Sequence, residues 1–80
     1  MNINLQFHST GKRTELNFDE TDKIELIKNS IRIMEGINPQ EQKLIFDGKV
    51  LKDTSTLKSC GIKDGSTISV LFEKSSNFLK

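Results

Sequence analysis

The dipeptide Asp47-Gly48 constrains the fold of this 80-residue chain more than any other feature of its sequence. An apolar run precedes it and a shorter one follows it. Glycine accepts the positive φ of a tight primed turn, so Asp-Gly between two apolar runs predicts a β-hairpin.

Ile45 is the unusual residue of this predicted hairpin. Because side chains alternate along a strand, Leu44 and Phe46 would share one face and Ile45 would point to the other. We expect Lys43 and Lys49 beside it. An isoleucine that faces water among lysines indicates a surface for docking a partner.

Length and charge limit the classes of function. Eighty residues allow one small domain with a single core. Twelve Lys and Arg against eleven Asp and Glu leave a net charge of +1, so no long-range field favours nucleic acid or an anionic membrane.

The sequence has no secretory-signal pattern, and no apolar stretch approaches the ~20 residues of a membrane span. The single cysteine, Cys60, excludes an internal disulfide, and we expect a cytoplasmic or nuclear protein.

Three further segments have the period-2 pattern of strands. Residues 1–8 alternate apolar and polar side chains, a turn follows at residues 9–12, and residues 13–18 alternate again, which predicts a first hairpin. The last strand is expected over residues 66–72. Its alternation points Leu71, like Ile45, away from the core.

One amphipathic helix is predicted between the two hairpins. Acidic and hydroxyl side chains at residues 19–22 suit a helix N-terminus, where Asp22 and Glu25 could form a capping box. The helix should end near Glu35-Gly36. Leu26 and Ile33 lie off its apolar stripe, and they either pack against flanking loops or form a second contact surface. The stripe itself comprises Ile24, Ile27, Ile31 and Met34.

The predicted element order is ββαββ, a short helical turn and β. Thr56 could cap that turn, which carries Leu57 and Cys60. One helix and a mixed sheet of four to five strands can cover each other as a two-layer α+β roll. We assign residues 1–74 to this domain and residues 75–80 to a polar tail or the start of a linker.

The sequence resembles the ubiquitin family from Met1 to about Glu73, which implies a ubiquitin-like β-grasp roll. Within the family, the segments 48–51 and 60–65 look most like the N-terminal ubiquitin-like domains of proteasome shuttle adaptors linked to excision repair. The matching residues are Thr10-Gly11-Lys12, Ile24, Ile27, Lys28, Ile31, Glu35-Gly36-Ile37, Pro39, Gln42-Lys43-Leu44-Ile45-Phe46, Gly48-Lys49, Thr56-Leu57, Ile62 and Ser66-Thr67.

The resemblance implies a docking patch. Ubiquitin presents an apolar patch on its middle strand, last strand and first turn, and the corresponding centre here is Ile45, Gly48 and Leu71. The edge differs, because Ser69 replaces a histidine and Glu73 replaces an arginine. The patch residues implied by the resemblance are Ile45, Leu71, Gly48, Lys43, Lys49, Ser69 and, at the first turn where ubiquitin has a leucine, His8 and Ser9.

The implied function is protein binding without catalysis. The partners would be proteasomal ubiquitin receptors, ubiquitin-interacting helices or ubiquitin-associated domains, with Lys43 and Lys49 steering acidic partners and Gly48 letting a partner approach the backbone. We expect a monomer, no cofactor and no binding to nucleic acid or membrane. The resemblance also matches Lys28 and Asp53 to an internal ion pair.

Catalytic and metal-binding readings find little support in the sequence. His8 and Cys60 form the only candidate nucleophile–base pair, but the fold would separate them, and Cys60 is expected to be a buried small hydrophobe. One His and one Cys cannot supply the ligands of a zinc site.

Two other classes of function remain open. Ubiquitin and its conjugated relatives end in Gly-Gly, whereas the segment 74–80 contains no glycine. The alternatives are a covalent modifier made as a precursor, and the targeting domain of a deubiquitinase or co-chaperone.

Overall fold

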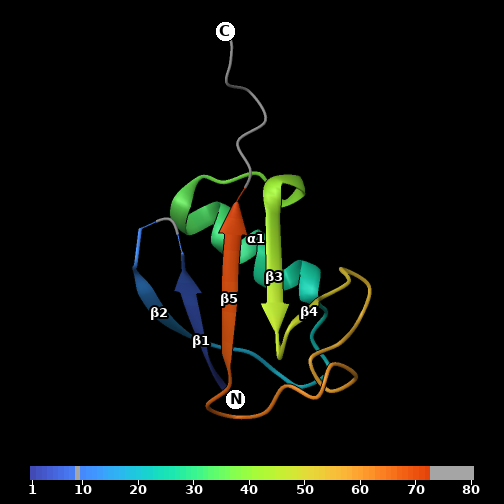
Figure 1. The fold of residues 1–80 in the computed structure, drawn as a ribbon. Helices are drawn as coiled ribbons and strands as arrows, with labels where there is room; N and C mark the ends of the chain where they lie inside the picture. The colour runs from blue at the N-terminus through green and yellow to red at the C-terminus, as the bar shows by residue number, and fades with distance from the viewer. Residues whose placement is uncertain (9, 73–80) are drawn as a thin grey trace, which may run out of the picture.

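The computed structural model describes residues 1–8 and 10–72 of the chain (Figure 1). Ser9, Glu73 and the tail assigned to residues 75–80 lie outside this part. The elements in chain order are β1 (Asn2–Phe7), β2 (Arg13–Asn17), α1 (Ile24–Glu35), the 3-10 helix η1 (Pro39–Glu41), β3 (Gln42–Phe46), β4 (Lys49–Val50) and β5 (Thr67–Phe72).

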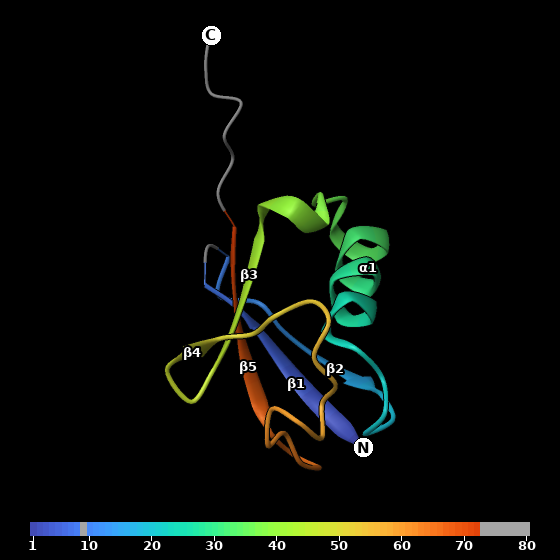
Figure 2. The same cartoon turned by 90° about the vertical axis from the view of Figure 1, so that its right-hand side faces the viewer.

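The strands form one five-stranded mixed sheet, in the order β2-β1-β5-β3-β4. The central pair, β1 and β5, is parallel, and the other pairs are antiparallel. Figure 2 shows α1 on one side of the strands. The predicted two-layer α+β roll is therefore confirmed, with the main helix covering one face of the sheet.

The core lies between α1 and the sheet. Alternation along β1 buries Ile3, Leu5 and Phe7, and the stripe on α1 buries Ile24, Ile27 and Ile31, as the sequence predicts. Leu44 of β3 and Val70 of β5 complete this layer, and both are fully buried. The opposite side chains of β3 and β5 therefore face away from the helix.

The two ends of α1 differ in how well the sequence predicts them. The N-cap is Lys23, whose side chain makes no capping hydrogen bond. The Asp22 carboxylate instead accepts a hydrogen bond from the Asp19 N–H at 2.8 Å, so the predicted capping box is wrong. Gly36 ends the helix as predicted, because it adopts the left-handed conformation (φ 71°) and donates its N–H to the Arg32 carbonyl.

The buried stripe of α1 includes Lys28, which was not expected in it, and does not include Met34, which was. Met34 is 40% exposed, whereas Lys28 is buried and its Nζ lies 2.7 Å from Asp53 Oδ1. The prediction for Met34 is wrong, and the ion pair implied by the resemblance is present. The aliphatic stem of a lysine can pack in the core while its ammonium meets a carboxylate at the surface.

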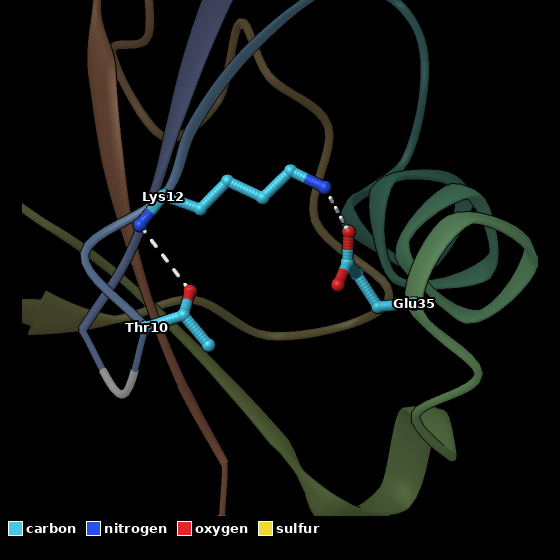
Figure 3. Close-up of polar contacts among 3 residues, drawn as sticks. All are labelled: Thr10, Lys12 and Glu35. Carbon is cyan, nitrogen blue, oxygen red and sulfur yellow. Dashed lines mark hydrogen bonds and ion pairs between the residues drawn. The ribbon is translucent and has the colours of Figure 1, made fainter.

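A polar contact joins the first turn to the end of α1. The Lys12 ammonium lies 2.8 Å from the Glu35 carboxylate, and the Lys12 N–H donates to the hydroxyl of Thr10 (Figure 3). The first turn is thereby tethered to the helix.

The connections contain one element that the sequence did not reveal. Asn38 accepts a hydrogen bond from the Gln40 N–H through its side chain and so caps the 3-10 helix η1.

Thr56 caps the later turn as predicted, since its hydroxyl accepts from the Ser59 N–H at 3.2 Å. Cys60 was expected to be a buried small hydrophobe; it packs against the core but is only partly buried. Within residues 1–8 and 10–72, no helix is long and apolar enough to cross a membrane.

Candidate docking surface

The sheet face that points away from α1 carries the candidate site. Ile45 of β3 lies opposite Val50 of β4 and Ser69 of β5, and Lys43 lies opposite Leu71. Directly opposed residues of antiparallel strands point to the same side of a sheet. We call these five residues, Lys43, Ile45, Val50, Ser69 and Leu71, the sheet-face patch.

The centre of the sheet-face patch is apolar and accessible. Val50 is 61% exposed, and Ile45 and Leu71 are partly exposed, whereas their chain neighbours Leu44 and Val70 are fully buried. The alternation predicted for Ile45 and Leu71 is therefore confirmed. Three apolar side chains from three strands form a contiguous surface that a partner could cover.

The turn between β3 and β4 sets which residues join the patch. Asp47 (φ 54°) and Gly48 (φ 78°) both have positive φ, so the predicted primed hairpin is confirmed. A two-residue turn pairs Phe46 with Lys49, and this register turns Lys49 to the side opposite Ile45. The prediction that Lys49 lies beside Ile45 is therefore wrong, and Val50 takes that place.

Gly48 leaves the backbone at the hairpin tip accessible. A Cβ built on this glycine would meet no atom within 4 Å, so nothing in the described part of the chain covers it. Its positive φ is what favours glycine there. Lys43 is exposed on the flank of the patch, next to Leu71.

His8 lies at the β1 end of the same surface. Its side chain is exposed, and its N–H donates to the Val70 carbonyl at 3.2 Å, which places His8 beside the strand that carries Leu71. Ser9, the other first-turn candidate, lies outside the described residues.

Val50 is the patch residue that sequence reasoning missed. The sequence predicted a hairpin here without assigning Val50 to either side of the sheet, and the structure places Val50 at the surface while its neighbour Leu51 is buried. The signal was nevertheless present, since a two-residue Asp-Gly turn fixes the register and places Val50 opposite Ile45.

The remaining polar groups lie elsewhere. Cys60 lines a hollow of about 340 Å³ together with Phe46, Val50 of the edge strand β4 and Ser59, whereas His8 follows β1, three strands away in the sheet order. Among residues 1–8 and 10–72, no group of three or more His, Cys, Asp or Glu could hold a metal ion. A hydrogen bond from the Thr21 hydroxyl lowers the pKa of Asp19, which lies between β2 and α1.

This geometry leaves apolar side chains on an accessible sheet face with Lys43 at its edge, which is what contact with a protein surface requires. The sequence pattern of the Ubiquitin family matches residues 3–75. The chain belongs to the ubiquitin family.

Three relatives show the range within the family. The chain is 42% identical over 59 residues to the ubiquitin-like protein NEDD8 of Dictyostelium discoideum, a match that covers 74% of this chain and 77% of the relative. It is 39% identical over 59 residues to ubiquitin-like protein 1 of Schizosaccharomyces pombe, over 74% of this chain and 76% of the relative.

The third relative is much longer than this chain. The ubiquitin domain-containing protein DSK2 of Saccharomyces cerevisiae is 32% identical over 68 residues, which is 85% of this chain and 18% of DSK2. Ubiquitin-family relatives of this chain therefore include both small proteins and a domain of a larger protein.

Proposed function

We propose that this ubiquitin-family domain is a non-catalytic binding module that docks a larger adaptor protein onto proteasomal ubiquitin receptors or ubiquitin-binding helices. The observation that carries the proposal is the apolar centre of the sheet-face patch, where Ile45, Val50 and Leu71 remain accessible on three adjacent strands. The match to one domain of DSK2 supports placement within a longer chain.

The chemistry of the patch suits an amphipathic helix as the partner. Apolar side chains on one face of such a helix could cover Ile45, Val50 and Leu71, and acidic residues on its flank would meet Lys43. The resemblance to shuttle adaptors linked to excision repair belongs to this proposal, as do the cytoplasmic or nuclear location and the absence of catalysis.

The test separates binding from folding. Ile45→Ala and Leu71→Ala should each weaken binding of a ubiquitin-interacting helix by about five- to a hundredfold, since anchor truncations cost on the order of 1–3 kcal/mol. Both variants should unfold near the wild-type temperature. Leu44→Ala is the matched control, because Leu44 is fully buried and its truncation should cost roughly 2–5 kcal/mol of stability.

Two results would contradict the proposal. One is an Ile45→Ala variant that binds the helix as tightly as wild type. The other is an Ile45→Ala variant that loses as much stability as Leu44→Ala, because that would place Ile45 in the core.

A covalent modifier made as a precursor is the second candidate function. It is favoured by the matches to two small ubiquitin-like proteins, which extend over about three quarters of both chains. Its conjugation would need a Gly-Gly end of the kind found in ubiquitin, and the five glycines of the given sequence include no such pair. Incubation with ATP and a ubiquitin-family activating enzyme should yield no thioester, and a charged adduct would favour the modifier.

A further inference from the structure

A second apolar surface lies far from the sheet-face patch, on the side of the sheet that carries α1. Ile33 is 81% exposed and Met34 is 40% exposed. With Ser30 they form the helix wall of a hollow of about 230 Å³. The end of β2, through Leu16 and Asn17, and the next residue, Phe18, form the other wall. We call this hollow the β2–α1 groove. None of the six lining residues is charged and four of them, Leu16, Phe18, Ile33 and Met34, are apolar, so the chemistry of the groove favours an apolar occupant.

The groove adjoins an open edge of the sheet. β2 is an edge strand, seen at the left margin of the sheet in Figure 1. Phe18 exchanges backbone hydrogen bonds with Met1, so its N–H and C=O point toward β1. Backbone groups alternate along a strand, and those of Glu15 and Asn17 therefore point outward, where the described part of the sheet has no further strand. This edge can accept another strand.

In place of the monomer expected from the sequence, we propose that the β2 edge and the β2–α1 groove together form a dimer interface, in which a second copy of this chain adds its own β2 antiparallel to the first. The two-fold axis passes beside Leu16, so Glu15 of each copy pairs with Asn17 of the other. These two pairs supply four backbone hydrogen bonds.

Side-chain packing supports this register. Leu16 lies opposite Leu16 of the second copy on the helix side of the extended sheet. Each copy thus contributes an apolar side chain beside the groove of the other, under the exposed Ile33. A docked second copy would withdraw Ile33 and Met34 from water, which is favourable in proportion to the apolar area covered.

Charge complementarity favours a second copy as the occupant. In this register Arg13 of each copy lies at the level of Asp19 of the other, because the two residues are equally far from Leu16 along the chain. Asp19 lies two residues beyond β2, in a turn in which its backbone is hydrogen-bonded to Asp22. Arg13 is exposed and donates one hydrogen bond to Gln6 Oε1 at 3.3 Å, and its guanidinium carries further N–H groups. Asp19 is exposed as well, and its carboxylate also accepts hydrogen bonds from the Thr21 N–H and hydroxyl. Two symmetry-related ion pairs between Arg13 and Asp19, one on each side of the paired Leu16 residues, would flank the apolar centre.

Neighbouring registers are worse. An axis beside Glu15 would place Glu15 opposite Glu15 of the second copy, and like charges directly opposed on paired strands are destabilising. An axis beside Thr14 would bring Lys12, which is ion-paired with Glu35, against Leu16. The Leu16 register avoids both conflicts.

Sedimentation velocity over a concentration series tests the proposal on the full chain. Wild type should form a reversible dimer, and Ile33→Asp should weaken it at least about tenfold. Val50→Asp is the matched control, because it places the same charge at an exposed apolar site on the opposite face and should leave the dimer unchanged. Ile33 is so exposed that its replacement should not affect thermal unfolding.

A charge exchange tests the register. Arg13→Glu and Asp19→Lys should each weaken the dimer when alone, because each creates two repulsive contacts. An equimolar mixture of the two variants should form a heterodimer, in which both contacts are attractive again. Thermal unfolding of each variant shows that it remains folded.

Four results would overturn the proposal. They are a wild type that stays monomeric throughout the series, a dimer that survives Ile33→Asp, a dimer that is lost in Val50→Asp, and two folded charge variants that do not combine. A monomer that instead binds an extended apolar peptide along β2 would assign the groove to a different protein.

Discussion

Gln42 is a buried polar side chain whose hydrogen bonds hold three segments together. It is only 3% exposed, and its Nε2 donates at 3.0 Å both to the Lys28 carbonyl in α1 and to the Ile37 carbonyl before η1. Its Oε1 is buried and has no hydrogen-bond partner in the described part of the protein. The two N–H donors of the amide therefore supply the hydrogen bonding of this side chain.

Replacing Gln42 with glutamate keeps the size of the side chain and removes those donors. At neutral pH the variant loses two hydrogen bonds, each contributing about 0.5–1.5 kcal/mol, and it buries a carboxylate beside two carbonyl oxygens. An uncompensated buried charge costs several kcal/mol. We expect a total loss on the order of 3–5 kcal/mol, a large share of the ~5–15 kcal/mol that stabilises a typical domain.

The loss should depend on pH with a definite sign. Burial without a counter-charge raises the pKa of the introduced carboxyl above its ordinary value of about 4.3. In its protonated form the carboxyl can donate one O–H bond, so the penalty is smallest below the ordinary pKa. As pH rises from there to the raised pKa of the folded state, the penalty grows by about 1.4 kcal/mol per pH unit.

Urea denaturation of wild type and Gln42→Glu between about pH 4 and pH 8 measures this difference in unfolding free energy. Gln42→Met is the control, because it loses the same hydrogen bonds without introducing a charge. Its free energy of unfolding should be lower than that of wild type by an amount that does not vary with pH. The reasoning fails if Gln42→Glu differs from wild type equally at all pH values, or if it matches Gln42→Met near neutrality.

Three shorter predictions concern other contacts. Asp53→Asn leaves the Lys28 ammonium, whose side chain is 11% exposed, without its carboxylate. The free energy of unfolding measured in urea should fall by about 1–3 kcal/mol, and adding Lys28→Met to the same chain should recover most of it. Thr21→Val removes the hydroxyl that lowers the pKa of Asp19, so an NMR titration should show that pKa rising toward its ordinary value. Because the folded-state pKa is the lowered one, the stabilisation by this contact is present above the ordinary pKa and is lost as pH falls through the folded-state value. An unchanged Asp19 titration in Thr21→Val would contradict the assignment. Gly36→Ala places a Cβ at φ 71° and should lower stability by about 1 kcal/mol, whereas a more stable variant would show that the helix end relaxes.

Local sequence rules predicted the fold where a local interaction determines the structure. Period-2 alternation identified β1, β2 and β5, and the Asp-Gly turn identified the β3–β4 hairpin, because turn conformation and strand alternation are set by neighbouring residues. Gly36 marked the end of α1 for the same reason.

The errors arose where distant parts of the chain decide the outcome. Met34 has the spacing of a core residue, but the last turn of α1 lies beside the groove next to β2, where no described segment covers it. The ion pair of Lys28 with Asp53 was expected only through the resemblance, because no local rule indicates that a carboxylate from a later loop will meet a buried lysine on the helix. Asp22 satisfied the composition of a capping box, yet its carboxylate accepts from Asp19 instead.

The candidate site was predictable in its centre and less so at its edge. Ile45 and Leu71 followed from alternation and resemblance, whereas Val50 required the register of the hairpin to be followed across the turn. The partners of the patch remain a proposal, because alternation determines which side chains are accessible and does not specify what covers them.

The parallel pairing of β1 with β5 has a mechanical consequence. The first and last strands lie side by side in the middle of the sheet, with Asn4 opposite Thr67 and Phe7 opposite Val70. A force that pulls Asn2 and Phe72 apart would slide these strands along each other, so it would load all of their hydrogen bonds at once. Pulling Asn2 away from Asn17, its partner at the open end of the antiparallel β1–β2 hairpin, would open the bonds one after another. We therefore expect the domain to resist a much larger force in single-molecule stretching through Asn2 and Phe72 than through Asn2 and Asn17.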